Sequence, residues 1–219
     1  MLVKDLMTAS VVTIREDQTM LEARELLRGK GLTSLPVVDD IDRVRGIITL
    51  DDVGKASPTE GSTLSRYEAN YLLGRLKVRD VMSRNVITVN DDDTMEYVAF
   101  QLYKNKVHAL PVVDGNNRLC GIASQTDLFR SFVEMMGMSR SCMRITIAAD
   151  DKVGFVADVT ALFKENNVNI ISLISHGNAE IGAELIVRAE VGDGGLAVVE
   201  SLREAGYNVT DIMSLQGLE

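Results

Sequence analysis

Apolar and polar positions along the first part of the chain predict short strands that alternate with helices. Runs of β-branched and apolar residues bounded by polar turns are typical of strands. Apolar residues at helical spacing after Ser, Thr or Asp are typical of a helix start. The expected order is therefore β-α-β-β-α. The expected strands are Val11–Ile14, Leu35–Asp39 and Val44–Ile48, and the expected helices cover Met20–Leu27, after Asp17 and Thr19, and the residues from Thr49 onward.

The same pattern returns about 75 residues later. Val3–Thr8 (VKDLMT) matches Val78–Ser83 (VRDVMS), and the LPVVD of Leu35–Asp39 is repeated at Leu110–Asp114. About 18 of 51 paired positions are identical without a gap, against roughly one in fifteen by chance. This is an internal duplication. The second copy predicts strands Val86–Val89, Leu110–Asp114 and Leu119–Ala123, and helices over Met95–Tyr103, after Asp92 and Thr94, and from Ser124.

The duplication also sets the expected domain organisation. Residues 1–56 form the first repeat and residues 78–138 the second. Because one unit cannot bury both faces of its sheet, the two copies are expected to pack sheet against sheet. Residues 57–77 predict a connector, a polar loop followed by a helix over Leu64–Leu76. The apolar face expected on that helix contains Leu64, Tyr67, Tyr71, Leu72 and Leu76.

Residues 143–217 follow a different pattern, β-α-β-β-α-β, which is the ferredoxin-like arrangement. The fold class is therefore mixed α/β (α+β), with the paired repeats followed by a second small domain. The expected strands are Met143–Ala148, Val168–Ser175, Ala183–Val191 and Val209–Leu215. The expected helices are Phe155–Asn166, with Val156, Val159, Leu162 and Phe163 on its apolar face, and Leu196–Ala205 before Gly206.

Composition and charge narrow the function. A net charge of −9 argues against nucleic-acid binding, because phosphate affinity comes from Lys and Arg. The first ten residues do not resemble a signal peptide, and no run approaches the ~20 apolar residues of a membrane span. We therefore expect a soluble, cytoplasmic protein without a membrane partner. Cys120 and Cys142 lie outside any C-x-x-C motif, and no metal or catalytic motif is found, so an enzyme is not expected.

The recurring motifs D-[LV]-M-[TS], V-x-T, L-P-V-V-D and G-I-x-[TS]-x-x-D resemble those of a pair of cystathionine-β-synthase (CBS) domains, the tandem module called a Bateman domain. The resemblance covers about residues 1–135. It implies that adenosine-containing ligands (AMP, ADP, ATP or S-adenosylmethionine) bind in clefts between the repeats. It implies no required cofactor.

The resemblance also implies which residues bind the nucleotide. In the family, the Asp of G-x-x-[TS]-x-x-D accepts hydrogen bonds from the ribose hydroxyls, as an ionised carboxylate can from two donors. The Thr or Ser approaches the sugar and phosphate, a nearby cation serves the phosphate, and the first strand contacts the base. These roles fall on Thr49, Asp52, Lys55, Val11, Val12 and Thr13 in the first copy, and on Ser124, Asp127, Arg130, His108, Val86, Ile87 and Thr88 in the second.

A structural role for the same residues stays open. T-x-x-D and S-x-x-D are also capping boxes, in which the acidic residue follows the N-cap by three positions. Asp52 and Asp127 can therefore be caps, ligand-binding residues or both. His108 can be a partly exposed loop histidine. Its neighbours Lys104 and Lys106 are expected to form a solvated helix end. Because the second copy offers more cationic groups, the two clefts are expected to differ in polyphosphate preference.

The segment DDKVGFVADVTALFKENNVNI resembles the start of an ACT domain, in which a D-x-x-G turn opens a helix that is followed by an N-I strand. The resemblance covers about residues 143–217 and implies an amino acid bound where two such domains meet. The amino-acid-binding residues would be Asp151, Val153, Gly154, Asn169 and Ile170. Alternatively, Gly154 only allows close packing and the domain serves dimerisation.

The whole arrangement, a CBS pair followed by an ACT domain, resembles the acetoin-utilisation B-type proteins. It predicts a regulatory ligand sensor that forms a homodimer and acts on a protein target that the sequence does not identify. Two alternatives remain. One is a structural adaptor without a ligand, and the other is an enzyme that hydrolyses the nucleotide it binds.

Overall fold

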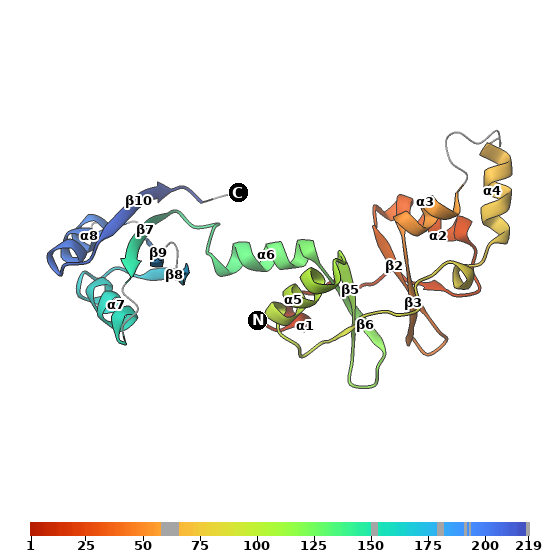
Figure 1. The fold of residues 1–219 in the computed structure, drawn as a ribbon, viewed down its shortest axis with the longest axis horizontal. Coiled ribbons are helices and arrows are strands. Elements are labelled where there is room, and N and C mark those ends of the chain that lie inside the picture. The colour runs from red at the N-terminus through yellow and green to blue at the C-terminus, as the bar shows by residue number, and fades with distance from the viewer. Residues whose placement is uncertain (58–65, 150–152, 179–181, 191, 193, 218–219) are drawn as a thin grey trace. The chain divides into compact units, whose positions relative to one another are not determined.

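The computed structural model describes residues 1–57, 66–149, 153–178, 182–190, 192 and 194–217 (Figure 1). They form two compact units, Met1–Phe129 and Arg130–Glu219. The first unit contains both repeats, each with its own three-stranded sheet, and the second contains a four-stranded sheet. The element order confirms β-α-β-β-α in each repeat and β-α-β-β-α-β after them.

The two repeats have the same topology and register. In each, the first short strand pairs in parallel with the second, and the second pairs antiparallel with the third. Both hairpins have a register shift at the equivalent place, after Val37 and after Val112. The elements of the first repeat are β1 (Ile14–Arg15), α2 (Met20–Lys30), β2 (Ser34–Val38), β3 (Val44–Thr49) and α3 (Leu50–Ala56), and those of the second are β4 (Val89–Asn90), α5 (Met95–Asn105), β5 (Ala109–Val113), β6 (Leu119–Ser124) and α6 (Gln125–Met135).

The first strand of each repeat is shorter than predicted and begins later. Residues 11–13 and 86–88 precede β1 and β4. Only Ile14 and Arg15 pair with β2, opposite Val37 and Val38. The prediction of strands over 11–14 and 86–89 was therefore wrong for three of the four positions. The β-branched side chains indicated an extended backbone, but the extent of a strand also depends on a partner for its hydrogen bonds.

Local chemistry explains where the two predicted helices begin. Thr19 is the N-cap of α2, and its side chain accepts a hydrogen bond from the backbone N–H of Glu22. The Glu22 carboxylate in turn accepts one from the backbone N–H of Thr19, which completes a capping box. Thr94 is the N-cap of α5, and its side chain accepts a hydrogen bond from the backbone N–H of Tyr97. Of the expected N-cap candidates the threonines occupy the cap positions, and Asp17 and Asp92 do not.

The N-terminal segments of the two repeats are exchanged. The short helix α1 (Val3–Leu6) belongs to the first repeat in sequence, but Val3 and Leu6 are buried in the core of the second. The 3-10 helix η1 (Val78–Asp80) does the reverse, because Val78 and Met82 are buried in the core of the first repeat. The exchange ties the repeats into one unit, which pattern reading within a single copy did not indicate.

A methionine and a glycine fit together at each exchanged contact. A β-carbon on Gly121 would collide with the side chain of Met7, and one on Gly46 would collide with that of Met82. The backbone bridges Thr8–Ile122 and Ile47–Ser83 continue each contact. The repeated Met of D-[LV]-M-[TS] and the repeated Gly of G-I-x-[TS] are therefore contact partners across the repeats.

The connector forms a helix, α4 (Arg66–Arg75), but its buried side differs from the predicted one. Leu73 is fully buried against the first repeat, whereas Tyr67, Tyr71 and Leu72 are exposed. The buried position is Leu73 and not the predicted Leu72, so α4 packs on the first repeat through a different side from the one predicted. Leu76 is partly buried beside Leu73, as expected, and Leu64 lies outside the described residues.

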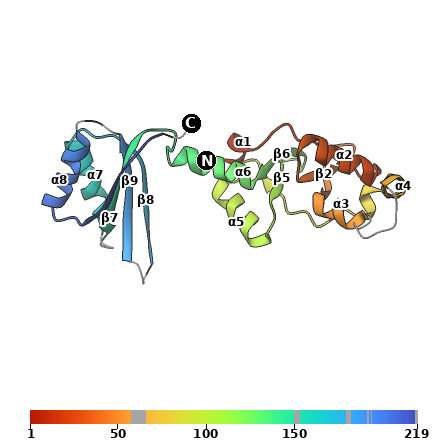
Figure 2. The same ribbon diagram turned by 90° about the horizontal axis from the view of Figure 1, so that it is seen from above.

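The second unit is a four-stranded antiparallel sheet in the order β10-β7-β9-β8. This is the strand order of a ferredoxin-like fold, with the first and third strands in the centre. Figure 2 shows both helices on one side of the sheet. The elements are β7 (Cys142–Ala149), α7 (Phe155–Glu165), β8 (Ile170–Asn178), β9 (Gly182–Glu190), α8 (Gly194–Glu204) and β10 (Val209–Leu215).

One core holds these helices to the sheet. The helices contribute large side chains such as Phe163 and Leu202, and the central strands contribute Ile145 and Val187. Of the four residues predicted on the apolar face of α7, Val159 and Phe163 are buried and Leu162 is partly buried. Val156 is 42% exposed, so its prediction as a core residue was wrong. Phe155 takes that place and packs edge-on against Tyr207.

Candidate ligand-binding cleft

A cavity of about 600 Å³ lies between the two repeats. Its volume is in the range of small-molecule sites, about 300–1,000 Å³. The first repeat contributes the start of β2, the end of β3 and the first residues of α3. The second contributes the segment before β4, the loop before β5 and β5 itself. The lining residues are Thr33, Ser34, Ile47, Thr49, Leu50 and Asp51, with Ser83, Asn85, Val86, Ile87, Lys106, Val107, His108, Ala109, Leu110 and Pro111.

The repeats position this lining through matching backbone hydrogen bonds. The N–H of Leu50, the first residue of α3, donates to the carbonyl of Thr33 at 3.0 Å. The N–H of Gln125, the first residue of α6, donates to the carbonyl of His108 at the same distance. Each bond holds the loop before the second strand of a repeat against the start of that repeat's last helix. Thr33 and His108 therefore occupy equivalent places in the cavity wall.

Both T/S-x-x-D motifs form capping boxes. The carboxylate Oδ2 of Asp52 accepts hydrogen bonds from the backbone N–H of Thr49 at 2.9 Å and from its hydroxyl at 2.7 Å. The Asp127 carboxylate accepts the equivalent bonds from Ser124 at 2.9 and 2.6 Å. The capping interpretation is confirmed for both carboxylates.

These caps limit what the two carboxylates can offer a ligand. One oxygen of each is occupied by the start of its own helix. Asp52 is half-buried, Asp127 is only 5% exposed, and neither is among the residues that line the cavity. Ligand binding by the two carboxylates therefore stays a prediction. Thr49, by contrast, is both a cap and a lining residue.

The charged residues at the cavity come from both repeats. Asp51 lines it and pairs with Lys55 at 2.6 Å, and this carboxylate raises the pKa of the exposed Lys55 ammonium. Lys106 and His108 line it from the second repeat. His108 Nδ1 lies 3.1 Å from the side-chain oxygen of Gln125. Arg130, expected beside them, is an exposed residue of α6 at the beginning of the second unit.

The cavity combines candidate residues of both copies. His108 and Val86 of the second copy line it together with Thr49 of the first. The physical reason is the exchange of N-terminal segments, which brings the residues after Met82 against β3 of the first repeat. Of the thirteen predicted nucleotide-binding residues, those that line this cavity are Thr49, Val86, Ile87 and His108, whereas Val11, Val12, Thr13, Asp52, Lys55, Thr88, Ser124, Asp127 and Arg130 do not.

Sequence reasoning did not identify all of the lining. Lys106 was considered only as part of a solvated helix end, yet it lines the cavity with a left-handed backbone, φ 54°. Its counterpart in the first repeat is Gly31, φ 64°. A lysine at a position that a glycine fills in the other copy was the available signal. Leu50 and Asp51 could have been inferred from their position next to Thr49.

The predicted amino-acid site of the second unit is described in part. Asp151 lies outside the described residues. Val153 is fully exposed, Asn169 is exposed and Ile170 begins β8. Gly154 precedes α7 with φ 92°, and a β-carbon there would meet no described atom within 4 Å. Among the described residues, Gly154 is therefore needed for its left-handed backbone conformation and not for close packing.

The described residues contain neither a membrane-spanning helix nor a group of metal ligands. Within the described ranges no helix combines the length and apolar character needed to cross a membrane. In the same part of the chain, no three His, Cys, Asp or Glu side chains are grouped as metal ligands would be.

The fold and the cleft between duplicated halves define a class of protein, the tandem CBS-domain proteins. The family model for the CBS domain matches residues 3–58 and 78–134. The chain therefore belongs to the CBS-domain family.

Curated relatives share this region alone. A homoserine O-acetyltransferase of Methanosalsum zhilinae is 34% identical over 126 residues, which is 58% of this chain and 23% of that protein. An L-aspartate semialdehyde sulfurtransferase of Methanocaldococcus jannaschii is 30% identical over 131 residues, 60% of this chain and 23% of that protein. The chain thus spans less than a quarter of these relatives. Their enzyme names describe proteins that match it in the CBS region only.

Solved structures with the same fold contain adenosine ligands. The CBS domain pair of protein MJ0100, in complex with 5′-methylthioadenosine and S-adenosylmethionine, is 30% identical with a TM-score of 0.50 and covers 60% of this chain and 95% of its own. CBSX2 in complex with AMP is 28% identical with a TM-score of 0.50, covering 60% and 96%. An acetoin-utilisation protein from Vibrio cholerae has a TM-score of 0.53 at 23% identity, covering 63% and 94%, and shows the fold alone.

Proposed function

We propose that this protein is a regulatory ligand sensor whose CBS pair binds an adenosine-containing nucleotide in the cleft between the repeats. The observation that carries the proposal is the cavity of about 600 Å³ lined by Thr49, Val86 and His108, residues that the family motifs mark for ligand binding. Its support from known proteins is that similar CBS pairs were solved with AMP, S-adenosylmethionine and methylthioadenosine. No cofactor and no catalysis are part of the proposal.

The lining offers a place for each part of such a ligand. Val86, Ile87 and Pro111 supply apolar surface for the flat adenine ring. Thr49 lies at the end of β3 and can accept or donate a hydrogen bond to the ribose. Lys106 and His108 are hydrogen-bond donors for a phosphate, and Lys106 brings the charge that strengthens such bonds. By the internal repeat, Val11, Thr13, Ser124, Asp127 and Arg130 would belong to a second cleft.

The second unit is the other part of the proposed sensor. Its ferredoxin-like fold and the D-x-x-G turn support an ACT domain that binds an amino acid near Gly154, Asn169 and Ile170, or that only dimerises. A homodimer is supported by the apolar rings that α5 exposes, Tyr97, Phe100 and Tyr103. Ligand binding would alter assembly or the affinity for a protein target. Couplings of this kind are typically about 1–3 kcal/mol.

A structural adaptor without a ligand is the second candidate. The observation that favours it is the use of Asp52 and Asp127 as caps, since a cap alone explains both motifs. The two candidates differ in what loss of a cap residue does to nucleotide affinity.

Titration calorimetry with AMP on wild type, Thr49→Ala and Thr19→Ala tests the proposal. Both threonines complete a capping box, but only Thr49 lines the cavity. Each substitution should cost about 1 kcal/mol of unfolding free energy. AMP affinity should fall about tenfold or more in Thr49→Ala, by the loss of one ligand hydrogen bond, and stay within about twofold in Thr19→Ala.

The adaptor gives a different result. It predicts no heat of binding with AMP, methylthioadenosine or S-adenosylmethionine at any concentration that saturates a sensor. Equal affinity losses in both variants would show that stability, and not contact with Thr49, controls binding. Either result would overturn the proposed site.

A further inference from the structure

The second unit presents a sheet face that α7 and α8 do not cover. At the β8 edge of that face the Ser172 hydroxyl donates a hydrogen bond to the carbonyl of Met136, just after α6. Helices α7 and α8 pack against one side of the sheet through Ile145, Leu185 and Val187 (Figure 2). Strand residues alternate between faces, so their neighbours in sequence point to the other side. We call that side the open face. Its residues include Arg144, Thr146 and Ala148 on β7, Ser172, Ile174 and His176 on β8, Glu184, Ile186 and Arg188 on β9, and Asp211 and Met213 on β10.

The register arranges most of the open face in three rows across the strands. A fourth row, of Leu215, Cys142 and Glu190, lies beyond the first, and Cys142 in it is fully buried. The first row contains Met213, Arg144, Arg188 and Ser172. The second contains Asp211, Thr146, Ile186 and Ile174. The third contains Ala148, Glu184 and His176. The first row is positive, and the third row carries a carboxylate beside a histidine. The row between them has Ile186 on the central strand β9 and Ile174 on the edge strand β8.

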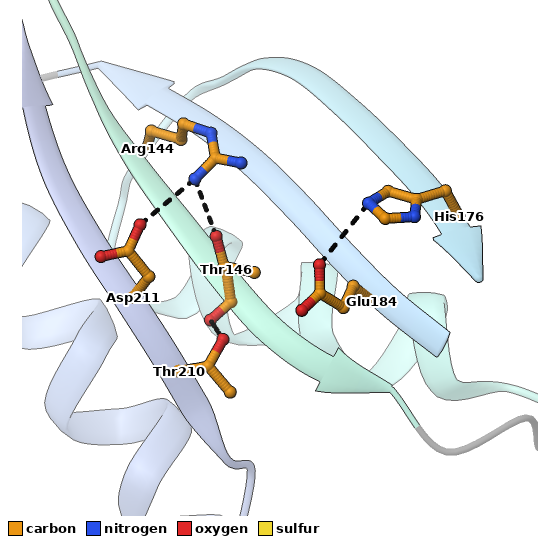
Figure 3. A network of polar contacts seen from close by, with 6 residues as sticks. All are labelled: Arg144, Thr146, His176, Glu184, Thr210 and Asp211. Carbon is orange, nitrogen blue, oxygen red and sulfur yellow. Dashed lines mark hydrogen bonds and ion pairs between the residues drawn. The ribbon is translucent and has the colours of Figure 1, made fainter. Parts of the chain in front are cut away.

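Figure 3 shows how part of this charge is already paired. Arg144 Nη1 lies 3.3 Å from the Asp211 carboxylate and 2.9 Å from the Thr146 hydroxyl. His176 Nε2 lies 3.5 Å from the Glu184 carboxylate. Arg188 is directly opposite Arg144 in the ladder, and like charges in that position are unfavourable. In the described part of the chain, neither a hydrogen bond nor an ion pair of the Arg188 guanidinium is found.

We propose that the open face docks on the open face of a second copy of this chain, with the two β9 strands antiparallel and Ile186 at the two-fold axis. A two-fold axis along the middle row places each first row over the third row of the other copy. Arg188 then faces Glu184 of the second copy, twice by symmetry. The isoleucines of the middle row face each other, and so do the two Asp211 carboxylates, each of which is paired with Arg144 of its own chain.

The charges distinguish this arrangement from the other face-to-face pairing. An axis parallel to the strands would exchange β7 with β9 and place Arg188 over Arg144 of the second copy. That pairing adds repulsion where the proposed pairing adds two ion pairs. Sheets packed face to face lie about 10 Å apart, and isologous contacts of this kind are the commonest in homo-oligomers. The inference does not depend on nucleotide binding in the first unit.

Cross-linking tests the axis. In the full chain with Cys120→Ser, Ile186→Cys is treated with a short bismaleimide, and Val156→Cys serves as the matched control. Val156 is exposed on α7, on the helix side of the sheet, and Cys142 is fully buried. Ile186→Cys should give about tenfold more covalent dimer than the control. Equal yields would overturn the proposal, including the case in which the face is covered by another part of the chain.

Charge exchange tests the pairing. Arg188→Glu alone should reduce the Ile186→Cys cross-link about tenfold, because it faces Glu184 of the second copy, and Glu184→Arg alone should do the same. The double variant should restore the yield to within about twofold of the unexchanged chain. Arg188→Glu also gains Arg144 as a neighbour, so it should remain folded, which circular dichroism checks. Unchanged yields in the single variants, or no recovery in the double variant, would refute the pairing.

Discussion

Lys106 and Gly31 occupy the same place in the two repeats and have the same left-handed backbone, yet only one is a glycine. The left-handed conformation costs an ordinary L-residue roughly 1–2 kcal/mol, part of which glycine loses again through its freedom in the unfolded chain. Lys106→Gly should therefore stabilise the protein by about 0.5–1 kcal/mol. Urea unfolding measures this gain. The residue that adopts this strained conformation is also a cation in the wall of the cavity.

The same variant should weaken a phosphate ligand while it strengthens the fold. AMP affinity is expected to fall about tenfold, because one charge-assisted hydrogen bond is lost, and methylthioadenosine affinity should stay unchanged. Gly31→Lys is the matched control. No described atom lies within 4 Å of a β-carbon there, so it should lose stability through the backbone alone. A stabilised Lys106→Gly variant with unchanged AMP affinity would remove Lys106 from the phosphate site.

For single residues, the sequence predicted the type of interaction better than the position of the residue in the fold. The capping boxes at Thr49 and Ser124 were foreseen because a cap is a contact between residues three apart. Lys106 was missed because its importance depends on the loop before β5 meeting another repeat. Val156 was misplaced because α7 was assigned a buried face one position away from Phe155.

At the scale of elements, each exchanged segment includes a tight contact between a methionine and a glycine of the other repeat. Gly121→Ala would place a methyl group against the Met7 side chain, and overpacking of this kind typically costs about 1–3 kcal/mol. Met7→Ala together with Gly121→Ala should lose less stability than the sum of the two single variants, with a coupling of about 0.5–3 kcal/mol. Unfolding curves of the four chains measure that coupling.

Gly115→Ala provides the control for this cycle. It lies in the β5–β6 turn, and a β-carbon there would meet no described atom within 4 Å. Its effect should stay within about 0.5 kcal/mol, as for most surface substitutions. Additive losses in the Met7 and Gly121 cycle would mean that the two residues are not partners.

The order of helices and strands in the repeats was predictable because the same apolar and polar pattern occurs in both copies. Strand lengths and the exchange of α1 and η1 were not, because both depend on pairing between segments distant in sequence. The DLMT motif was recognised as a repeated string, but its helix packs on the other copy. Apolar periodicity indicates that Val3 and Leu6 are buried without indicating which core receives them.

At the scale of the whole molecule, α6 is the element that both units share. Its first residue, Gln125, is bonded to His108 in the cavity wall through its backbone N–H and its side chain. Its last turn leads to Gly137, on which the Ile171 side chain packs, and the Met136 carbonyl accepts a hydrogen bond from the Ser172 hydroxyl. The boundary between the two units along the chain lies within this helix, between Phe129 and Arg130.

A ligand held by His108 should therefore slow amide exchange along all of α6 and not only in its first turn, because a helix forms cooperatively. AMP at 100 times its dissociation constant stabilises the binding state by about 2.7 kcal/mol, which sets the largest possible effect. Hydrogen-exchange mass spectrometry should show protection from Gln125 through Met135. In His108→Ala that protection should disappear even when AMP is raised to saturate the variant. Protection that ends at Phe129 in wild type would show that the nucleotide signal does not reach the second unit through this helix.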